Sequence, residues 1–224
     1  AYTVSQSIAD EYHHKYGVEF KVVRNFPTNE KLVHKVQLPF DPGERKILIY
    51  QGSLNTGRGL ELIIDSVCEI ENIIFLIVGD GDIRNDLQYY VSTKNVTEKV
   101  IFMGQVPFEN LHSITVQADA GVTFEEDIGL NYRYALPNKL FDYIFARIPV
   151  LVSSLPEMAG IVTSYGVGIV GIKRDVEHVR QYIKELLFDE KQREIWKKNL
   201  VKASSELLWE NEEKALLDIY YPLI

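Results

Sequence analysis

Short apolar runs alternate with amphipathic stretches through the middle of the chain. Six runs rich in Ile, Val, Leu and Phe cover residues 46–52, 73–79, 99–104, 120–124, 150–153 and 167–170. Most of the segments between them carry apolar residues at helical spacing, as residues 59–71 do. Strands that alternate with helices of this length are joined by right-handed crossovers. The pattern therefore predicts an α/β fold with a doubly wound, Rossmann-like parallel sheet of about six strands.

The two ends of the chain depart from this alternation. Residues 1–44 contain one predicted helix, over residues 5–16, and a connector that holds two prolines. Residues 45–175 form the predicted sheet domain. Residues 176–224 carry apolar stripes at helical spacing, which predict C-terminal helices. Because the first residue is Ala1 rather than Met, we expect the chain to be part of a longer protein.

Composition and charge narrow the classes of function. Apolar residues make up 46% of the 224 residues, which is enough for a packed core. The net charge of −8 disfavours a nucleic-acid partner, since such proteins present a basic face. The longest apolar run, residues 73–78, is too short to cross a bilayer, so no transmembrane segment is expected. With Cys68 as the only cysteine, a reducing, cytoplasmic location fits.

The segment over residues 136–153 carries the clearest chemical signal. Pro137 and Asn138 open a predicted helix, where proline loses nothing and asparagine is a good cap. Lys139 follows in the first turn, and a helix start beside a cation is suited to a phosphate. Asp142, one turn later, can hold the hydroxyls of a ribose. The segment therefore predicts a nucleotide site.

Three predicted strands end in glycine, at Gly52, Gly79 and Gly104. Ligands of doubly wound sheets bind beyond the carboxyl ends of the strands, where glycine lets the backbone approach a ligand. The alternative is that these glycines only turn tight corners. Residues 79–82 hold two glycines of a dinucleotide fingerprint but lack the third, and the P-loop pattern is absent, so neither motif indicates its usual ligand.

Arg58 lies between two glycines at the predicted start of a helix. A cation there opposes the helix dipole and costs about 0.3–1 kcal/mol unless an anion neutralises it. A diphosphate partner would explain the residue, because the guanidinium fork matches phosphate oxygens. The alternative is an arginine that faces solvent.

The predicted connection over residues 125–136 is long for this kind of fold and lies at the ligand-binding edge. It begins with three carboxylates, Glu125, Glu126 and Asp127, for which a solvated acidic turn or a sugar-contacting loop is favoured over a metal site. The five histidines lie in no catalytic or metal-binding spacing, so surface or packing roles are expected for them.

Taken together, these motifs resemble the C-terminal half of glycosyltransferase family 4, whose members are retaining enzymes of GT-B architecture. The matching segments are YQG (50–52), RGLE (58–61), IVGDG (77–81), FMG with VP (102–107), ADAGV (118–122), PNKLFDY (137–143) and IPV (148–150). The resemblance covers roughly residues 46–171. It also makes residues 1–44 look like a remnant of the family's N-terminal domain plus a linker, to which the last helix is expected to cross back.

The resemblance implies transfer of a sugar, with retention, from a nucleotide donor such as a UDP- or GDP-sugar. It implies no cofactor beyond this donor. A glycan or lipid-linked acceptor would bind the N-terminal domain, so this fragment is expected to be inactive alone. In the full-length protein the location is expected to be cytoplasmic or peripheral at the membrane. Two alternatives stay open: a nucleotide-sugar epimerase of the same architecture, and a non-enzymatic nucleotide-binding domain.

The resemblance also implies roles for individual residues. Arg58 matches the family's diphosphate-binding lysine, and Asp142 matches its ribose-binding glutamate. The family's base-binding backbone falls near Gln105 and Val106. Donor contacts are further expected at the three strand-end glycines, at Ser53 beside the first of them, and at the helix start, that is, at Gly52, Ser53, Gly79, Gly104, Asn138, Lys139 and Leu140.

Two positions depart from the family pattern. Ser53 replaces a phosphate-binding arginine, and we expect Lys139 to substitute for it. Tyr134 stands where the family has the first glutamate of its motif, and Glu126 is expected to take over the sugar contact. The expected catalytic residues are therefore Arg58, Lys139 and Glu126, without a metal.

Overall fold

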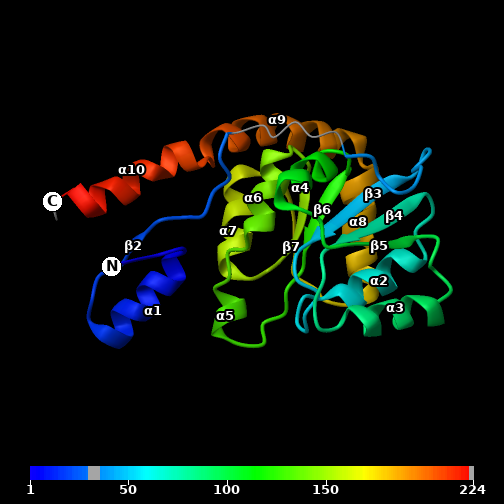
Figure 1. Ribbon diagram of the computed structural model, residues 1–224, viewed down its shortest axis with the longest axis horizontal. Helices are drawn as coiled ribbons and strands as arrows, with labels where there is room; N and C mark the ends of the chain where they lie inside the picture. Colours follow the sequence, from blue (N-terminus) through cyan, green and yellow to red (C-terminus); the bar gives the residue numbers. More distant parts are fainter. Residues whose placement is uncertain (30–35, 222–224) are drawn as a thin grey trace.

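The computed structural model describes residues 1–29 and 36–221. Its centre is a six-stranded sheet in the order β5-β4-β3-β6-β7-β8, with every pair of neighbours parallel (Figure 1). The strands are β3 (Lys46–Gln51), β4 (Ile73–Val78), β5 (Val100–Gly104), β6 (Ala120–Thr123), β7 (Val150–Ser153) and β8 (Gly168–Gly171). The predicted fold class is thereby confirmed.

Helices cover both faces of this sheet, which explains why its strands are continuously apolar. On one face α2 (Leu60–Cys68) packs against α3 (Arg84–Thr93) and α8 (Val176–Phe188). On the other face α4 (Phe108–Thr115) packs against α6 (Asn138–Phe145), and α7 (Pro156–Tyr165) packs on β7 and β8. All six residues of β4 are buried, as expected for a strand covered on both faces.

The strand order reverses between β3 and β6. The chain runs outward from β3 to β4 and β5, then crosses back to β6 and runs outward the other way to β7 and β8. Leu48 of β3 pairs with Ala120 of β6 at this switch point. In open α/β sheets the ends of two such strands diverge and leave a crevice beyond their carboxyl ends, where ligands bind. The topology therefore places a candidate site after Gln51 and after Thr123.

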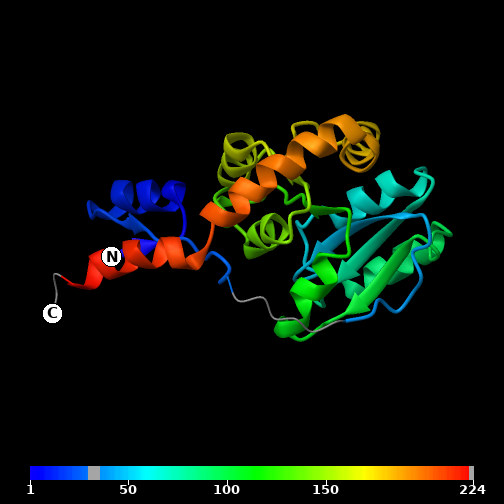
Figure 2. The same cartoon turned by 90° about the horizontal axis from the view of Figure 1, so that it is seen from above.

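The first residues of the chain and the last described helix lie side by side, away from the sheet (Figures 1 and 2). The N-terminal segment contains β1 (Tyr2–Thr3), α1 (Gln6–Tyr16) and β2 (Lys21–Val22), and the two strands pair in parallel. Helix α9 (Glu190–Glu206) packs on α6, α7 and α8 and leads into α10 (Trp209–Tyr220). The backbone N–H of Trp209 donates to the Pro27 carbonyl, so α10 packs beside the N-terminal segment.

Two local features differ from the expectations. Asn138 does not cap its helix: it is the first residue of α6, Pro137 occupies the capping position, and no side chain of the described residues caps the helix. The long connection after β6 contains a short helix, α5 (Leu130–Arg133), which no periodic apolar pattern in the sequence predicts. The first turn of α6 therefore leaves its backbone donors without a capping side chain.

Candidate functional site

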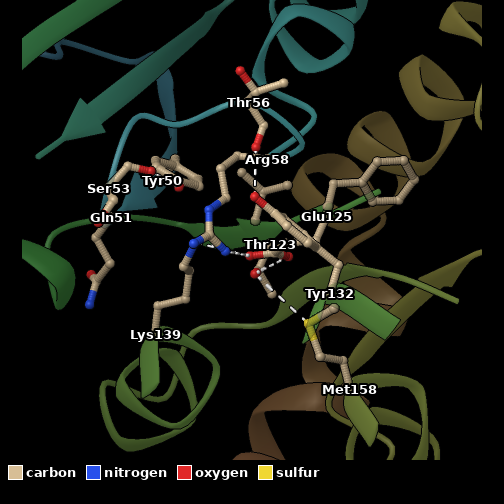
Figure 3. Close-up of polar contacts among 12 residues, drawn as sticks. Tyr50, Gln51, Ser53, Thr56, Arg58, Thr123, Glu125, Tyr132, Lys139 and Met158 are labelled. Carbon is tan, nitrogen blue, oxygen red and sulfur yellow. Dashed lines mark hydrogen bonds and ion pairs between the residues drawn. The ribbon is translucent and has the colours of Figure 1, made fainter. Parts of the chain in front are cut away.

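Three charged side chains meet at the switch point (Figure 3). Arg58 comes from the loop between β3 and α2, Glu125 follows β6, and Lys139 lies in the first turn of α6. The Lys139 Nζ atom lies 3.1 Å and the Arg58 Nη1 atom 3.4 Å from the same oxygen, Oε1, of Glu125. Two cations thus share one carboxylate, and the cluster keeps a net positive charge of one.

Glu125 lies on the side of the cluster that is shielded from solvent. The Glu125 side chain is fully buried, and its second oxygen accepts a 2.7 Å hydrogen bond from the Thr123 hydroxyl. Burial alone raises the pKa of this carboxyl, but the Lys139 ammonium and the Thr123 hydroxyl lower it below its usual value. Glu125 is therefore ionised at neutral pH.

Lys139 occupies the space beside the first strand-end glycine. Its ammonium lies 4.1 Å from the centre of the Tyr50 ring, and a Cβ atom at Gly52 would sit 3.3 Å from Lys139 Cε. Burial lowers the pKa of Lys139 below its usual value, and the Arg58 guanidinium adds to this shift, whereas the Glu125 carboxylate opposes it. Gly52, with φ of 132°, leaves room for the lysine in a conformation that other residues rarely adopt.

The loop after β6 folds over Arg58. The Tyr132 hydroxyl of α5 donates to the Thr56 carbonyl at 2.8 Å, and the Arg58 guanidinium lies 5.5 Å from the centre of the Tyr132 ring. Arg174, just before α8, donates to the carbonyls of Phe124 and Glu125 at 3.0 and 2.9 Å. These contacts fix the backbone on both sides of the charged cluster.

Two adjoining pockets open beside the cluster. The first, of about 400 Å³, lies over the ends of β3, β4 and β5 and is lined by Gly52, Ser53, Val78, Gly79, Asp80, Gly81, Gln105, Val106 and Leu111. The second, of about 190 Å³, lies between α4 and α6 and includes Gln51, Asn138 and Asp142. Leu111 lines both, so the two pockets are neighbours.

Asp142 faces the second pocket and is held by a short chain of polar side chains. The Gln51 amide donates to Asp142 Oδ2 at 2.9 Å, and the Thr115 hydroxyl donates to Gln51 Oε1 at 2.8 Å. Burial raises the pKa of Asp142 from 3.8 to about 6, although the Gln51 hydrogen bond opposes the rise. This carboxylate can accept hydrogen bonds from a ligand, and its charge changes just below neutral pH.

The structure brings together most of the residues predicted from the sequence. Arg58 and Lys139 share the cluster, and Gly52 borders it. Gly52, Ser53, Gly79, Gln105 and Val106 line the first pocket, and Gly104 supports it by accepting a hydrogen bond from the Gly79 N–H. Asn138 and Asp142 line the second pocket.

Two of the predicted site residues, Leu140 and Glu126, line neither pocket, and their expected donor contacts stay predictions. Leu140 lines neither pocket: its side chain is buried in the core, and its N–H donates to the Pro137 carbonyl. Among the described residues the ion-pair partner of Glu126 is Arg174, at 3.9 Å. Its neighbour Glu125, expected in a solvated acidic turn or a sugar-contacting loop, is buried and contacts both cations of the cluster. Arg174 also donates to the carbonyls of Phe124 and Glu125, so it binds the backbone of this turn.

Gln51 and Glu125 are the site residues that sequence reasoning missed. Gln51 is the last residue of β3 and Glu125 lies two residues after the end of β6, so both lie at the carboxyl ends of the switch-point strands, and this position is the signal that could have identified them. Among the described residues no group of three or more His, Cys, Asp or Glu side chains is arranged to hold a metal ion. Within the same residues no helix is long and apolar enough to span a membrane.

Comparison with known proteins agrees with this architecture. The family described as Glycosyl transferases group 1 matches residues 35–202. An uncharacterized glycosyltransferase, MJ1607, of Methanocaldococcus jannaschii is 25% identical over 236 residues, a match that covers 97% of this chain and 58% of that protein. The chain therefore spans little more than half the length of this relative.

Solved structures share the fold. Anabaena Alr3699/HepE, in complex with UDP and glucose, superposes with a TM-score of 0.79 at 12% identity, over 96% of this chain and 61% of that one. Sucrose-phosphate synthase of Thermosynechococcus elongatus gives 0.77 at 20% identity, over 98% and 57%. Since the family match covers more than half of the sequence and contains the whole charged cluster, the chain belongs to the glycosyl transferases group 1 family.

Proposed function

We propose that this chain is the donor-binding half of a retaining glycosyltransferase and that the switch-point cluster binds the diphosphate of a nucleotide sugar. The observation that carries the proposal is the shared carboxylate: Arg58 and Lys139 both contact Glu125 Oε1, which leaves one uncompensated positive charge at the crevice. A positive charge next to the uncapped start of α6 suits a phosphate.

The two pockets provide room for the rest of the donor. The base would lie in the first pocket, against the backbone of Gln105 and Val106, and the ribose would reach Asp142 in the second. Relatives support a UDP donor, since the HepE structure contains UDP and glucose and the pneumococcal GtfA structure contains UDP and GlcNAc. Acceptor binding and transfer would need the part of the protein that such relatives have beyond this match.

In the proposed reaction the bond between the anomeric carbon and the diphosphate breaks, and negative charge grows on the leaving oxygen. Arg58 and Lys139 would lie where that charge develops, and fixed cations in a partly dry site stabilise it without reorganising. Both cations are already held by Glu125 before the donor arrives. The chain itself would thus supply the electrostatic part of catalysis.

A thermal-shift panel tests the proposal. We expect UDP-, GDP- or ADP-sugars to raise the melting temperature, because a ligand at one hundred times its Kd stabilises the native state by about 2.7 kcal/mol. For a domain of this size this corresponds to about 5–10 °C. Free sugar and adenosine, which lack the diphosphate, serve as controls. If no nucleotide sugar shifts the transition at millimolar concentration, the proposed function is wrong.

Binding should weaken in mild acid. Asp142 has a pKa of about 6 and accepts hydrogen bonds from the ribose best when it is ionised. We expect the Kd for UDP-glucose to rise about three- to tenfold between about pH 7.5 and about pH 5, and Asp142→Asn to remove this dependence. Isothermal titration calorimetry measures both. A nucleotide sugar is the right probe, because its phosphates are esterified and keep their charge over this range. A pH dependence that persists unchanged in Asp142→Asn would assign it to another group.

The same pKa shift has a consequence for stability. The carboxyl of Asp142 titrates at 3.8 when unfolded and at about 6 when folded, so its stabilising contribution is complete below pH 3.8 and is lost as the pH rises through about 6. At neutral pH the native state therefore holds an unfavourably buried carboxylate. Asp142→Asn should accordingly raise the free energy of unfolding there by about 1–3 kcal/mol, measured by urea denaturation.

A further inference from the structure

Glu125 is the most deeply buried member of the charged cluster. Its side chain is fully buried, whereas Lys139 keeps 9% and Arg58 a quarter of its side chain exposed. The carboxylate is fixed from behind by the Thr123 hydroxyl, and its backbone is held by Arg174. Any effect of Glu125 on a bound donor therefore passes through the two cations.

The two cations need this carboxylate in order to stay together. Like charges at such short range repel each other, and burial further disfavours a charged lysine. Lys139 is only 9% exposed, and Glu125 is its one ion-pair partner among the described residues. An ammonium in that position without a counter-charge would lose its proton more readily, and Arg58 would lose the anchor of its guanidinium.

We infer that Glu125 is the positioning residue of the donor site: its buried carboxylate holds Arg58 and Lys139 side by side, and keeps Lys139 charged, so that the diphosphate meets a preformed pair of cations. This inference rests on the proposed function. It assigns Glu125 no contact with the donor, so Glu125 acts only by placing and charging the residues that make the contact.

The charged and titratable groups around Lys139 determine which side chain of the site changes its charge with pH. Arg58 approaches from the loop after β3, and its guanidinium lies 3.4 Å from the Glu125 carboxylate. Tyr50 faces Lys139 from β3, and its pKa is raised by burial, so it stays neutral. Glu126 and Arg174 lie behind Glu125 and pair with each other. When Glu125 is made neutral, Lys139 is the group whose charge changes as the pH rises.

The test is Glu125→Gln, which keeps the shape of the side chain and removes its charge. The probe is UDP-glucose, with GDP-mannose as a second probe, titrated by calorimetry from about pH 6.5 to about pH 9. We expect Glu125→Gln to bind about tenfold more weakly than wild type near pH 9, and this difference to shrink as the pH falls, because Lys139 loses its proton more readily without the Glu125 carboxylate. A purely structural role would weaken binding equally at every pH.

Two further variants make the result specific. Glu125→Gln combined with Lys139→Arg carries a cation that does not titrate, so the pH dependence should disappear. Glu125→Asp keeps the charge but is one methylene shorter, so binding should weaken several-fold while its pH profile stays like that of wild type. This second variant decides the matter if Glu125→Gln does not fold, because wild-type affinity in Glu125→Asp would overturn the positioning role.

The failures of the two proposals can be told apart. If wild type binds neither probe, the proposed function fails, and the role of Glu125 fails with it. If wild type binds and loses affinity when Arg58 is replaced, while Glu125→Gln binds like wild type at every pH, the donor site stands and only the role of Glu125 is wrong.

Discussion

Removing either cation of the cluster should weaken binding of a nucleotide sugar by one to two orders of magnitude. A hydrogen bond between charged partners contributes about 1.5–3 kcal/mol, which corresponds to about a 10- to 100-fold change in Kd. We expect a loss of this size for Arg58→Ala and for Lys139→Met, measured by calorimetry with UDP-glucose. Arg58 is partly exposed and Lys139 is buried, so the loss should be larger for the lysine.

The controls separate lost contacts from lost structure. Lys46→Ala also removes an ion-paired lysine, which contacts Asp119 at 3.0 Å. Lys46 is the first residue of β3, so it lies at the end of the strands opposite to the charged cluster. Its affinity should match wild type. Lys139→Met leaves Glu125 with a single ion-pair partner, so a combined variant with Glu125→Gln is needed to remove the buried charge. Unchanged affinity in both Arg58→Ala and Lys139→Met would contradict the proposal that these two cations bind the diphosphate.

Replacing Gly79 by alanine should destabilise the whole domain. Gly79 has φ of 137° and packs against the Gly52 backbone, so a Cβ atom there would collide with the Gly52 carbonyl. The strained backbone and the overpacking each cost about 1–3 kcal/mol, so Gly79→Ala should lower the free energy of unfolding by about 3–5 kcal/mol. Urea denaturation measures this. Because Gly52 and Gly79 both line the first pocket, nucleotide binding should weaken as well.

Gly160→Ala is the matched control. Gly160 lies inside α7, and a Cβ atom there would meet no heavy atom within 4 Å. The same substitution at this position should stabilise the protein by about 0.5–1 kcal/mol, since alanine is the better helix former. Equal effects at the two positions would show that the corner at Gly79 can relax, contrary to the geometry.

The sheet could be predicted from the sequence because its strands are covered on both faces. A fully buried strand such as β4 leaves a continuous apolar run that is visible without any neighbour. Helix α5 could not be predicted, since its four residues include none that is buried and it is held only by contacts such as that of Tyr132 with Thr56. Local structure that depends on distant partners leaves no periodic pattern.

The same distinction applies to the site. Arg58 and Lys139 could be found because their positions at helix starts carry an electrostatic argument of their own. The inward carboxylate could not be told from its neighbour, since Glu125 and Glu126 are adjacent in a loop without a period. The two side chains have different partners: Glu125 contacts Lys139 and Arg58, whereas Glu126 contacts Arg174, which is far along the chain.

The strand order has a consequence for how the protein folds. Arg58 follows β3 and Glu125 follows β6. These two strands are neighbours in the sheet, but β4 and β5 lie between them in the sequence. Closing so long a loop costs conformational entropy before the new contacts can offset it. The pairing of β3 with β6 is therefore expected to form late in folding. The charged cluster exists only once that pairing is made, and a nucleotide that binds it would report that folding is complete.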